Sequence, residues 1–225
     1  MSDTNGKNQS TLEISEPYIN ITFPLQGNKL PADHAYALYA CVTKALPNLH
    51  GASWLAVEMI SGIPWDKGII ALPRKGAMLH LRIPADKFAS VLPLAGKRLD
   101  IEGHILCLGI PFARPLTPAS SVYARVVTIK NHTEPDTFLE AATRKLAQIN
   151  INATLELPRN GRTRTRRIVT IHDKKVVGFS LVAHGLNDED SIKLQTIGIG
   201  GRRTMGCGIF NPISKTLDSG AKNEA

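Results

Sequence analysis

Hydrophobic positions along residues 12–108 change period several times, and the order of the periods predicts one α+β unit. Over 12–24 many apolar residues occupy alternate positions, as in a half-buried strand. Between Leu38 and Ala45 they recur at spacings of three or four, as on the buried face of a helix. The predicted elements are a strand over 12–24, a helix from 30–33 to about Leu46, strands over 54–60 and 77–83, a short helix over 86–94 and a strand over 99–108.

The same order repeats after residue 120, with an extra hairpin. Residues 111–120 carry three prolines and no periodicity, which indicates a linker. The predicted elements of the second half are a strand over 122–129, a helix from Pro135 with the stripe Phe138, Ala142, Leu146 and Ile149, strands over 154–157, 164–171 and 176–182, a helix from Asn187 or Asp188 to before Gly198, and a strand over 205–210. We therefore expect an α+β fold of two tandem ferredoxin-like (βαββαβ) domains, 11–110 and 121–214, with flexible ends at 1–10 and 215–225.

Composition indicates a soluble globular protein. The chain has 225 residues, 43% hydrophobic and 20% charged, which is enough apolar material for a sizeable core. It contains no run of about 20 apolar residues and no apolar signal-peptide segment, so we expect a cytoplasmic protein without a membrane partner. Three scattered cysteines fit neither a disulfide framework nor a thiolate zinc site. Trp54 and Trp65 are interpreted as core residues.

Positive charge points to a polyanionic partner. Lys and Arg number 27 against 19 Asp and Glu, for a formal net charge of +8. Arg162, Arg164 and Arg166 alternate with other residues, so on a strand they would project from one face and form a track for phosphates. A solvated edge strand protected by charge is the structural alternative.

A glycine-rich run over 198–210 is the sharpest motif. Gly198, Gly200 and Gly201 would let the backbone approach a phosphate closely, and Arg202 and Arg203 add charge there. The run follows a helix and precedes the last strand, whereas a dinucleotide-binding fingerprint follows a strand and opens a helix. A glycine-rich turn with two solvated arginines is the alternative.

The motif Gly-Ile-Gly-Gly-Arg-Arg-Thr-Met-Gly-Cys-Gly, at the end of tandem ferredoxin-like halves, resembles the CRISPR-associated pre-crRNA endoribonucleases (Cas six) of the RAMP superfamily, in particular their MYXAN-type branch. The likeness covers most of 17–212, and Leu-Pro-Ala-Asp-His-Ala-Tyr-Ala-Leu-Tyr and Leu-Pro-Asn-Leu-His-Gly also contribute. It implies an enzyme that binds CRISPR repeat RNA, as pre-crRNA and as mature crRNA, and works with other Cas proteins of an interference complex.

The resemblance also implies chemistry without a metal or another cofactor. RNA supplies its own nucleophile, the 2′-hydroxyl, so a base, a proton donor and positive charge suffice. His34 and His50 match the family's location for the catalytic imidazole, in or just after the first helix. The helix dipole would keep His34 neutral, and a loop position frees the His50 ring. Tyr36, Tyr39 and Lys44 are candidate auxiliaries.

Each candidate also has a structural interpretation. His34 could be a packing residue and His50 an ordinary loop histidine, and the two can cooperate only if the loop folds back over the helix. The acidic run 188–190 is interpreted as a helix start rather than a metal site. The remaining histidines are interpreted as structural or solvated: His80, His104, His132, His172 and His184. A non-catalytic RNA-binding subunit and a small-molecule enzyme or sensor with the same fold are the rival functions.

Overall fold

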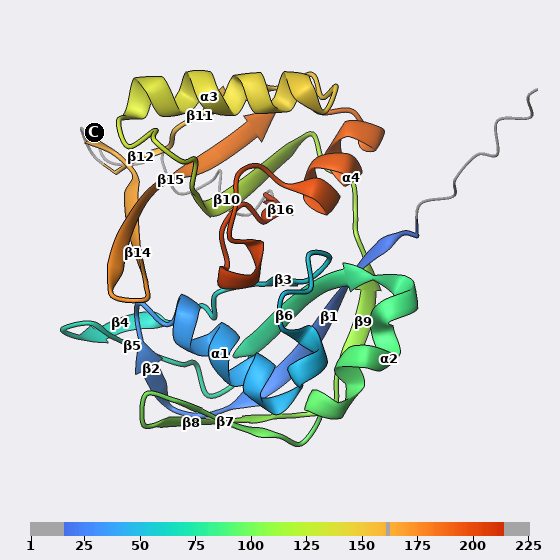
Figure 1. The fold of residues 1–225 in the computed structure, drawn as a ribbon, viewed down its shortest axis with the longest axis vertical. Helices are drawn as coiled ribbons and strands as arrows, with labels where there is room; N and C mark the ends of the chain where they lie inside the picture. Colours follow the sequence, from blue (N-terminus) through green and yellow to red (C-terminus); the bar gives the residue numbers. More distant parts are fainter. Residues whose placement is uncertain (1–15, 161–162, 214–225) are drawn as a thin grey trace, which may run out of the picture.

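The computed structural model describes residues 16–160 and 163–213, which form two halves drawn one above the other in Figure 1. The first half, blue to green, consists of β1 (Tyr18–Gln26), β2 (Lys29–Pro31), α1 (Ala35–Ala45), η1 (Pro47–Leu49), β3 (Ala56–Val57), β4 (Ile63–Asp66), β5 (Ile69–Ala71), β6 (Met78–Pro84), η2 (Ala85–Lys87), α2 (Phe88–Val91), η3 (Leu92–Leu94), β7 (Arg98–Ile101), β8 (His104–Leu108) and β9 (Phe112–Pro115). The second half consists of β10 (Ser121–Val127), α3 (Pro135–Gln148), β11 (Thr154–Glu156), β12 (Arg159–Asn160), β13 (Thr163–Arg164), β14 (Arg166–Ile171), β15 (Lys174–His184), α4 (Asp188–Ile197), η4 (Arg203–Met205) and β16 (Phe210–Pro212).

The first half has the strand order of a ferredoxin-like unit. Its antiparallel sheet runs β3-β6-β1-β8-β7, so the first strand lies between the third and the fourth of the βαββαβ pattern. Ile21 and Phe23 of β1 and Leu38 and Val42 of α1 are almost fully buried in the core of this half. The alternating strand pattern and the helical stripe therefore predicted the core correctly.

Several predicted bounds in the first half are wrong. Residues 29–31 form β2 rather than the start of the helix, because they pair with β5. The strand predicted over 54–60 is reduced to Ala56–Val57. Part of the predicted linker is the strand β9, which pairs with β1. Trp54 packs partly buried against the core, but Trp65 on β4 is 72% exposed and is not a core residue.

The second half repeats the topology and adds a hairpin. Its sheet runs β11-β15-β10-β16, again with the first strand between the third and the fourth, and β14 also pairs with β15. The register Ile171↔Lys174 closes this hairpin with a two-residue turn. In Figure 1 the β14–β15 hairpin reaches down from the upper half to the side of α1.

Two predicted strands of the second half are wrong in detail. The strand over 164–171 is divided, because Thr163–Arg164 pair with β12 while Arg166–Ile171 pair with β15. Arg164 and Arg166 therefore lie on separate strands, and Arg162 lies outside the described residues. The last strand is Phe210–Pro212 rather than 205–210, because the glycine-rich loop continues through Gly208.

The start of α4 confirms the interpretation of the acidic run. The backbone N–H of Asp190 donates to the Asn187 side-chain oxygen at 2.7 Å, and residues 188–190 place three carboxylates in the first turn. These negative charges lie at the positive end of the helix dipole. Within 16–160 and 163–213, no helix is long and apolar enough to cross a membrane.

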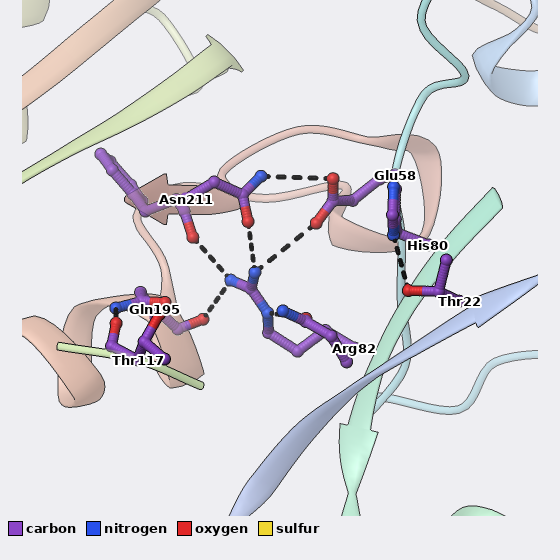
Figure 2. A network of polar contacts seen from close by, with 9 residues as sticks. Thr22, Glu58, His80, Arg82, Thr117, Gln195 and Asn211 are labelled. Atoms are coloured by element: carbon purple, nitrogen blue, oxygen red, sulfur yellow. Dashed lines mark hydrogen bonds and ion pairs between the residues drawn. The ribbon is translucent and has the colours of Figure 1, made fainter. Parts of the chain in front are cut away.

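A buried arginine connects the two sheets. Arg82 of β6 is fully buried, and its Nη1 donates to the carbonyl oxygens of Gln195, at 2.9 Å, and Phe210, at 2.7 Å (Figure 2). Its Nη2 donates to the Asn211 side-chain oxygen at 2.5 Å. One side chain of the first half thereby binds the end of α4 and the last strand of the second half.

The charge of Arg82 is compensated from the first half. Its Nε donates to the Asn20 side chain at 2.9 Å, and Glu58 lies 3.5 Å from Nη2. Glu58 also accepts a hydrogen bond from the Asn211 side-chain amide at 3.2 Å. Burial lowers the pKa of Arg82 to about 10, which leaves it protonated at neutral pH. We call Arg82 and these hydrogen-bonded partners the Arg82 cluster.

Candidate functional site

A cleft of about 480 Å³ lies where α1 meets the second half. Its lining residues come from α1, from the loop after it, from the tip of the β14–β15 hairpin and from the glycine-rich loop: Tyr36, Tyr39, Ala40, Thr43, Lys44, Pro47, His50, His172 and Met205. We call it the junction cleft. It contains His50 and all three candidate auxiliaries, but not His34.

His50 reaches the cleft because its loop folds back onto α1. Leu49 is fully buried and anchors the turn that ends at His50. The Tyr39 hydroxyl accepts a hydrogen bond from the backbone N–H of Gly51 at 3.0 Å. The Tyr39 and His50 rings stack with centroids 6.3 Å apart and planes 21° apart. Tyr39 therefore positions the loop, while the His50 side chain remains exposed.

His34 has no ring nitrogen available for a substrate. It is fully buried just before α1, and its Nδ1 lies 2.7 Å from the Pro31 carbonyl oxygen. Its Nε2 accepts the backbone N–H of Ile60 at 2.9 Å, so the neutral tautomer with the proton on Nδ1 satisfies both bonds. Burial is the main cause that lowers the pKa of His34. We expected a neutral His34 from the sequence, but attributed it to the helix dipole rather than to burial. The hydrogen bonds on both ring nitrogens favour the interpretation of His34 as a packing residue.

His172 enters the cleft from the second half. It occupies the turn between β14 and β15, and its ring lies 4.4 Å from that of Tyr36, measured between centroids. The hairpin is held there by Thr170, whose backbone N–H donates to the Asp33 carboxylate at 2.9 Å. The sequence interpretation of His172 as structural or solvated missed this placement. Alternating residues on both sides of His172-Asp173 indicate a hairpin, but not where its tip lies.

The exposed face of α1 forms one wall of the cleft. Tyr36, Ala40 and Lys44 are four residues apart, so they lie above one another on the helix. The opposite face carries Leu38 and Val42 into the core. The amphipathic pattern of α1 thus leaves an aromatic ring and an ammonium group facing the two exposed imidazoles.

A second pocket of about 380 Å³ gathers arginines. Arg125 of β10 and Arg166 and Arg167 of β14 line it together with Asp33. Burial lowers the pKa of Arg125, and the charge of Arg167 lowers it further. Across residues 16–160 and 163–213, the ion pairs involve none of these three arginines. Sequence reasoning missed Arg125 because it alternates with apolar residues of a core strand.

The glycine-rich loop is packed more tightly than the sequence suggests. Gly198 and Gly200 have φ angles of +71° and +82°. A Cβ on Gly198 would lie 2.1 Å from the Gly208 carbonyl oxygen, and one on Gly200 would lie 2.3 Å from that of Thr128. These glycines permit close packing of protein backbone. Gly201, which has no atom within 4 Å of such a Cβ, is exposed and remains open to a ligand.

The two arginines of the loop differ. Arg202 is exposed and its Nη1 donates to the Thr128 hydroxyl at 3.3 Å. Arg203 folds over its own loop, with Nε 3.4 Å from the position that a Cβ on Gly198 would occupy. Its Nε and Nη2 are buried without a hydrogen-bond partner among the described residues, and burial lowers its pKa. Arg202, rather than Arg203, faces solvent.

The part of the chain that the structure describes contains no group of three or more His, Cys, Asp or Glu side chains arranged for a metal ion. The junction cleft presents imidazole, phenol and ammonium groups, and the second pocket presents three guanidinium groups. Such groups can transfer protons and bind a phosphodiester.

Comparisons with known proteins agree on one family. The family described as Cas6 Crispr matches residues 19–215. The CRISPR-associated endonuclease Cas6 of Myxococcus xanthus (strain DK1622) is 40% identical over 195 residues, which cover 87% of this chain and 81% of that protein.

Solved structures show the same fold. A CRISPR associated protein Cas6 is similar with a TM-score of 0.63 and 14% identity, over 88% of this chain and all of that one. A Cas6-related protein from Pyrococcus furiosus is similar with a TM-score of 0.60 and 14% identity, over 89% of this chain and 99% of that one. These matches confirm the expected pair of ferredoxin-like units. The chain belongs to the Cas6 family of CRISPR-associated proteins.

Proposed function

We propose that this protein is a metal-independent endoribonuclease that binds CRISPR repeat RNA and cuts pre-crRNA, leaving 2′,3′-cyclic phosphate and 5′-hydroxyl ends. The observation that carries the proposal is the junction cleft, where the exposed His50 imidazole shares a surface with Lys44 and lies at the meeting of the two halves. The Myxococcus xanthus relative, at 40% identity, is an endonuclease.

His50 acts as the general base in this proposal. A neutral ring nitrogen takes the proton of the 2′-hydroxyl as that oxygen attacks the adjacent phosphorus. Lys44 stabilises negative charge on the phosphate, and Tyr39 keeps the loop of His50 in place through Gly51. His34 holds the start of α1 through Pro31 and Ile60 and takes no part in proton transfer.

RNA binding rests on positive charge beside the β14–β15 hairpin. Arg125, Arg166 and Arg167 line the pocket beside β14, and the turn of the same hairpin places His172 in the junction cleft. A phosphate backbone that follows the hairpin meets these guanidinium groups first and then the cleft. Arg202 and Gly201 supply further contacts from the glycine-rich loop. Phosphate and 2′-hydroxyl contacts of this kind recognise RNA structure.

The test is cleavage of end-labelled repeat RNA from the host, in EDTA and with Mg²⁺, alongside the same RNA with one 2′-deoxy nucleotide at the cut site. We expect equal cleavage with and without EDTA, and no cleavage of the deoxy substrate although it still binds. Cleavage that requires Mg²⁺ would refute the metal-independent mechanism. Tight binding of the repeat without any cleavage would indicate a non-catalytic RNA-binding subunit.

A further inference from the structure

We propose that His172 is the general acid of the cleavage reaction, so that the two halves each contribute one imidazole to the junction cleft. The inference rests on the proposed endoribonuclease function and adds a residue to it. The exposed side chains of His172 and His50 line the same cleft, one from the β14–β15 turn and the other from the loop after α1.

Three kinds of contact fix the position of His172. Val169, 3% exposed, packs in a small apolar cluster with Ala35, Val126 and Cys207, which joins β14 to the first half. The hydrogen bond from the Thr170 backbone N–H to Asp33 holds the end of β14 against the loop before α1. The Tyr36 ring then supports the imidazole at 4.4 Å. The tip is thereby anchored to the helix that forms the cleft wall.

The backbone conformation of the turn is compatible with this role of His172. His172 and Asp173 both have positive φ, +47° and +62°, where turns of this type favour Asn-Gly. A non-glycine residue costs free energy in this conformation, and such residues cluster at functional sites. Histidine and aspartate are among the non-glycine residues that adopt positive φ most often, so the two-residue turn accommodates an imidazole at its first position.

Cleavage requires a second proton transfer that His50 cannot supply in the same step. The 2′-oxygen forms its bond to phosphorus while its proton passes to His50. The bond from phosphorus to the 5′-oxygen breaks, its electron pair remains on that oxygen, and the His172 imidazolium gives it a proton. The products are the 2′,3′-cyclic phosphate and the 5′-hydroxyl, with His50 protonated and His172 neutral, and proton exchange with water restores both.

The experiment compares His172→Asn with wild type on two repeat RNAs, one natural and one with sulfur in place of the bridging 5′-oxygen at the cut site. A thiolate leaves without protonation, so loss of the acid matters only for the oxygen substrate. Asparagine tolerates positive φ, and Asp173→Asn makes a matched change in the same turn. Melting temperature and RNA affinity are measured for each variant.

We expect His172→Asn to slow cleavage of natural RNA by about 10² to 10⁴-fold, with wild-type affinity, and to cut the sulfur substrate at a rate close to that of wild type. Asp173→Asn cuts both at wild-type rates. Unchanged cleavage of natural RNA by His172→Asn, or equal slowing on both substrates, would overturn the role of His172. Rescue of His50→Ala by sulfur would reverse the two roles. If wild type cuts neither RNA, the proposed function itself fails.

Discussion

The two halves meet through two polar regions of opposite character. In the Arg82 cluster, Arg82 is 0% exposed and its guanidinium nitrogens donate to oxygens of both halves (Figure 2). In the junction cleft, His50 and His172 are exposed; the His50 ring stacks on Tyr39 and the His172 ring lies tilted against Tyr36, with no hydrogen bond to either imidazole among the described residues. The centre of the Arg82 cluster is therefore closed to solvent, whereas the junction cleft is open to it.

We therefore expect the Arg82 cluster to contribute mainly to the stability of the fold and the junction cleft mainly to the reaction. A buried charge surrounded by partners costs much free energy if one partner is lost, because the others remain buried and unsatisfied. An exposed imidazole contributes little to folding and keeps its lone pair or proton for a ligand. The glycine-rich loop connects the two regions, because it places Met205 in the cleft and leads into β16, whose Phe210 and Asn211 belong to the Arg82 cluster.

The largest effect on stability is expected for Arg82→Ala. It leaves Glu58, Asn20 and Asn211 without their common donor, so we expect a loss of about 3–5 kcal/mol in the free energy of unfolding, measured by urea denaturation. Lys87→Ala, which removes an exposed ion pair with Asp86, is the control and should cost at most about 1 kcal/mol. Equal effects would mean that Arg82 does not join the halves.

Gly200→Ala tests the glycine-rich loop that connects the two regions. Its φ of +82° and the contact of a new Cβ with the Thr128 carbonyl oxygen force the backbone to move, and we expect a loss of about 1–3 kcal/mol. Gly201→Ala adds the same methyl group in open space and should change stability far less. Thermal unfolding measures the stability of both variants. An equal loss of stability in the two would contradict the close packing of the loop at Gly200.

The buried His34 predicts a pH dependence of the free energy of unfolding. Burial lowers the pKa of His34 from 6.5 in the folded state, so below pH 6.5 the unfolded state binds more protons. Stability should therefore fall as the pH falls, by up to about 1.4 kcal/mol per pH unit until the folded pKa is reached. Denaturation of wild type and His34→Gln between pH 7 and 5.5 measures it. An identical slope in both would show that His34 is not the cause.

The smallest effect concerns RNA binding. Replacing Arg166 and Arg167 by Ala removes two charges from the arginine-lined pocket, and the slope of log affinity against log salt should become shallower by about 0.7–0.9 for each lost phosphate contact. Arg144→Ala on α3, whose side chain is 61% exposed beside Glu140, should leave the slope unchanged. A pocket variant with the wild-type slope would place the RNA elsewhere.

Periodicity predicted the two ferredoxin-like units because the buried faces of their main strands and helices follow local periods of two and of three to four residues. The alternation over β1 and the stripe Phe138, Ala142 and Leu146 of α3 correspond to buried faces. Elements formed by pairing between distant segments were missed: β2 pairs with β5, and β9 crosses back to β1. Neither has a period of its own that the sequence could reveal.

The candidate site was predicted only in part for a similar reason. His50 and its neighbours Tyr36, Tyr39 and Lys44 come from one continuous segment, so the first helix and its loop indicated them together. His172 and Arg125 join the site through tertiary contacts of the β14–β15 hairpin. His34 and His50 are the same residue type, and the structure separates them by the burial of His34 and by the hydrogen bonds of its two ring nitrogens.

The decisive measurement is single-turnover cleavage of repeat RNA by His50→Ala and His34→Gln, with both variants shown to be folded and to bind the RNA. It asks whether the exposed histidine of the junction cleft, rather than the buried one, takes part in the reaction. We predict that His50→Ala cleaves more slowly than wild type by about 10² to 10⁴-fold at unchanged affinity and melting temperature, while His34→Gln is less stable but stays within about tenfold of the wild-type rate. Wild-type cleavage by His50→Ala, or loss of cleavage by folded, RNA-bound His34→Gln, would contradict it.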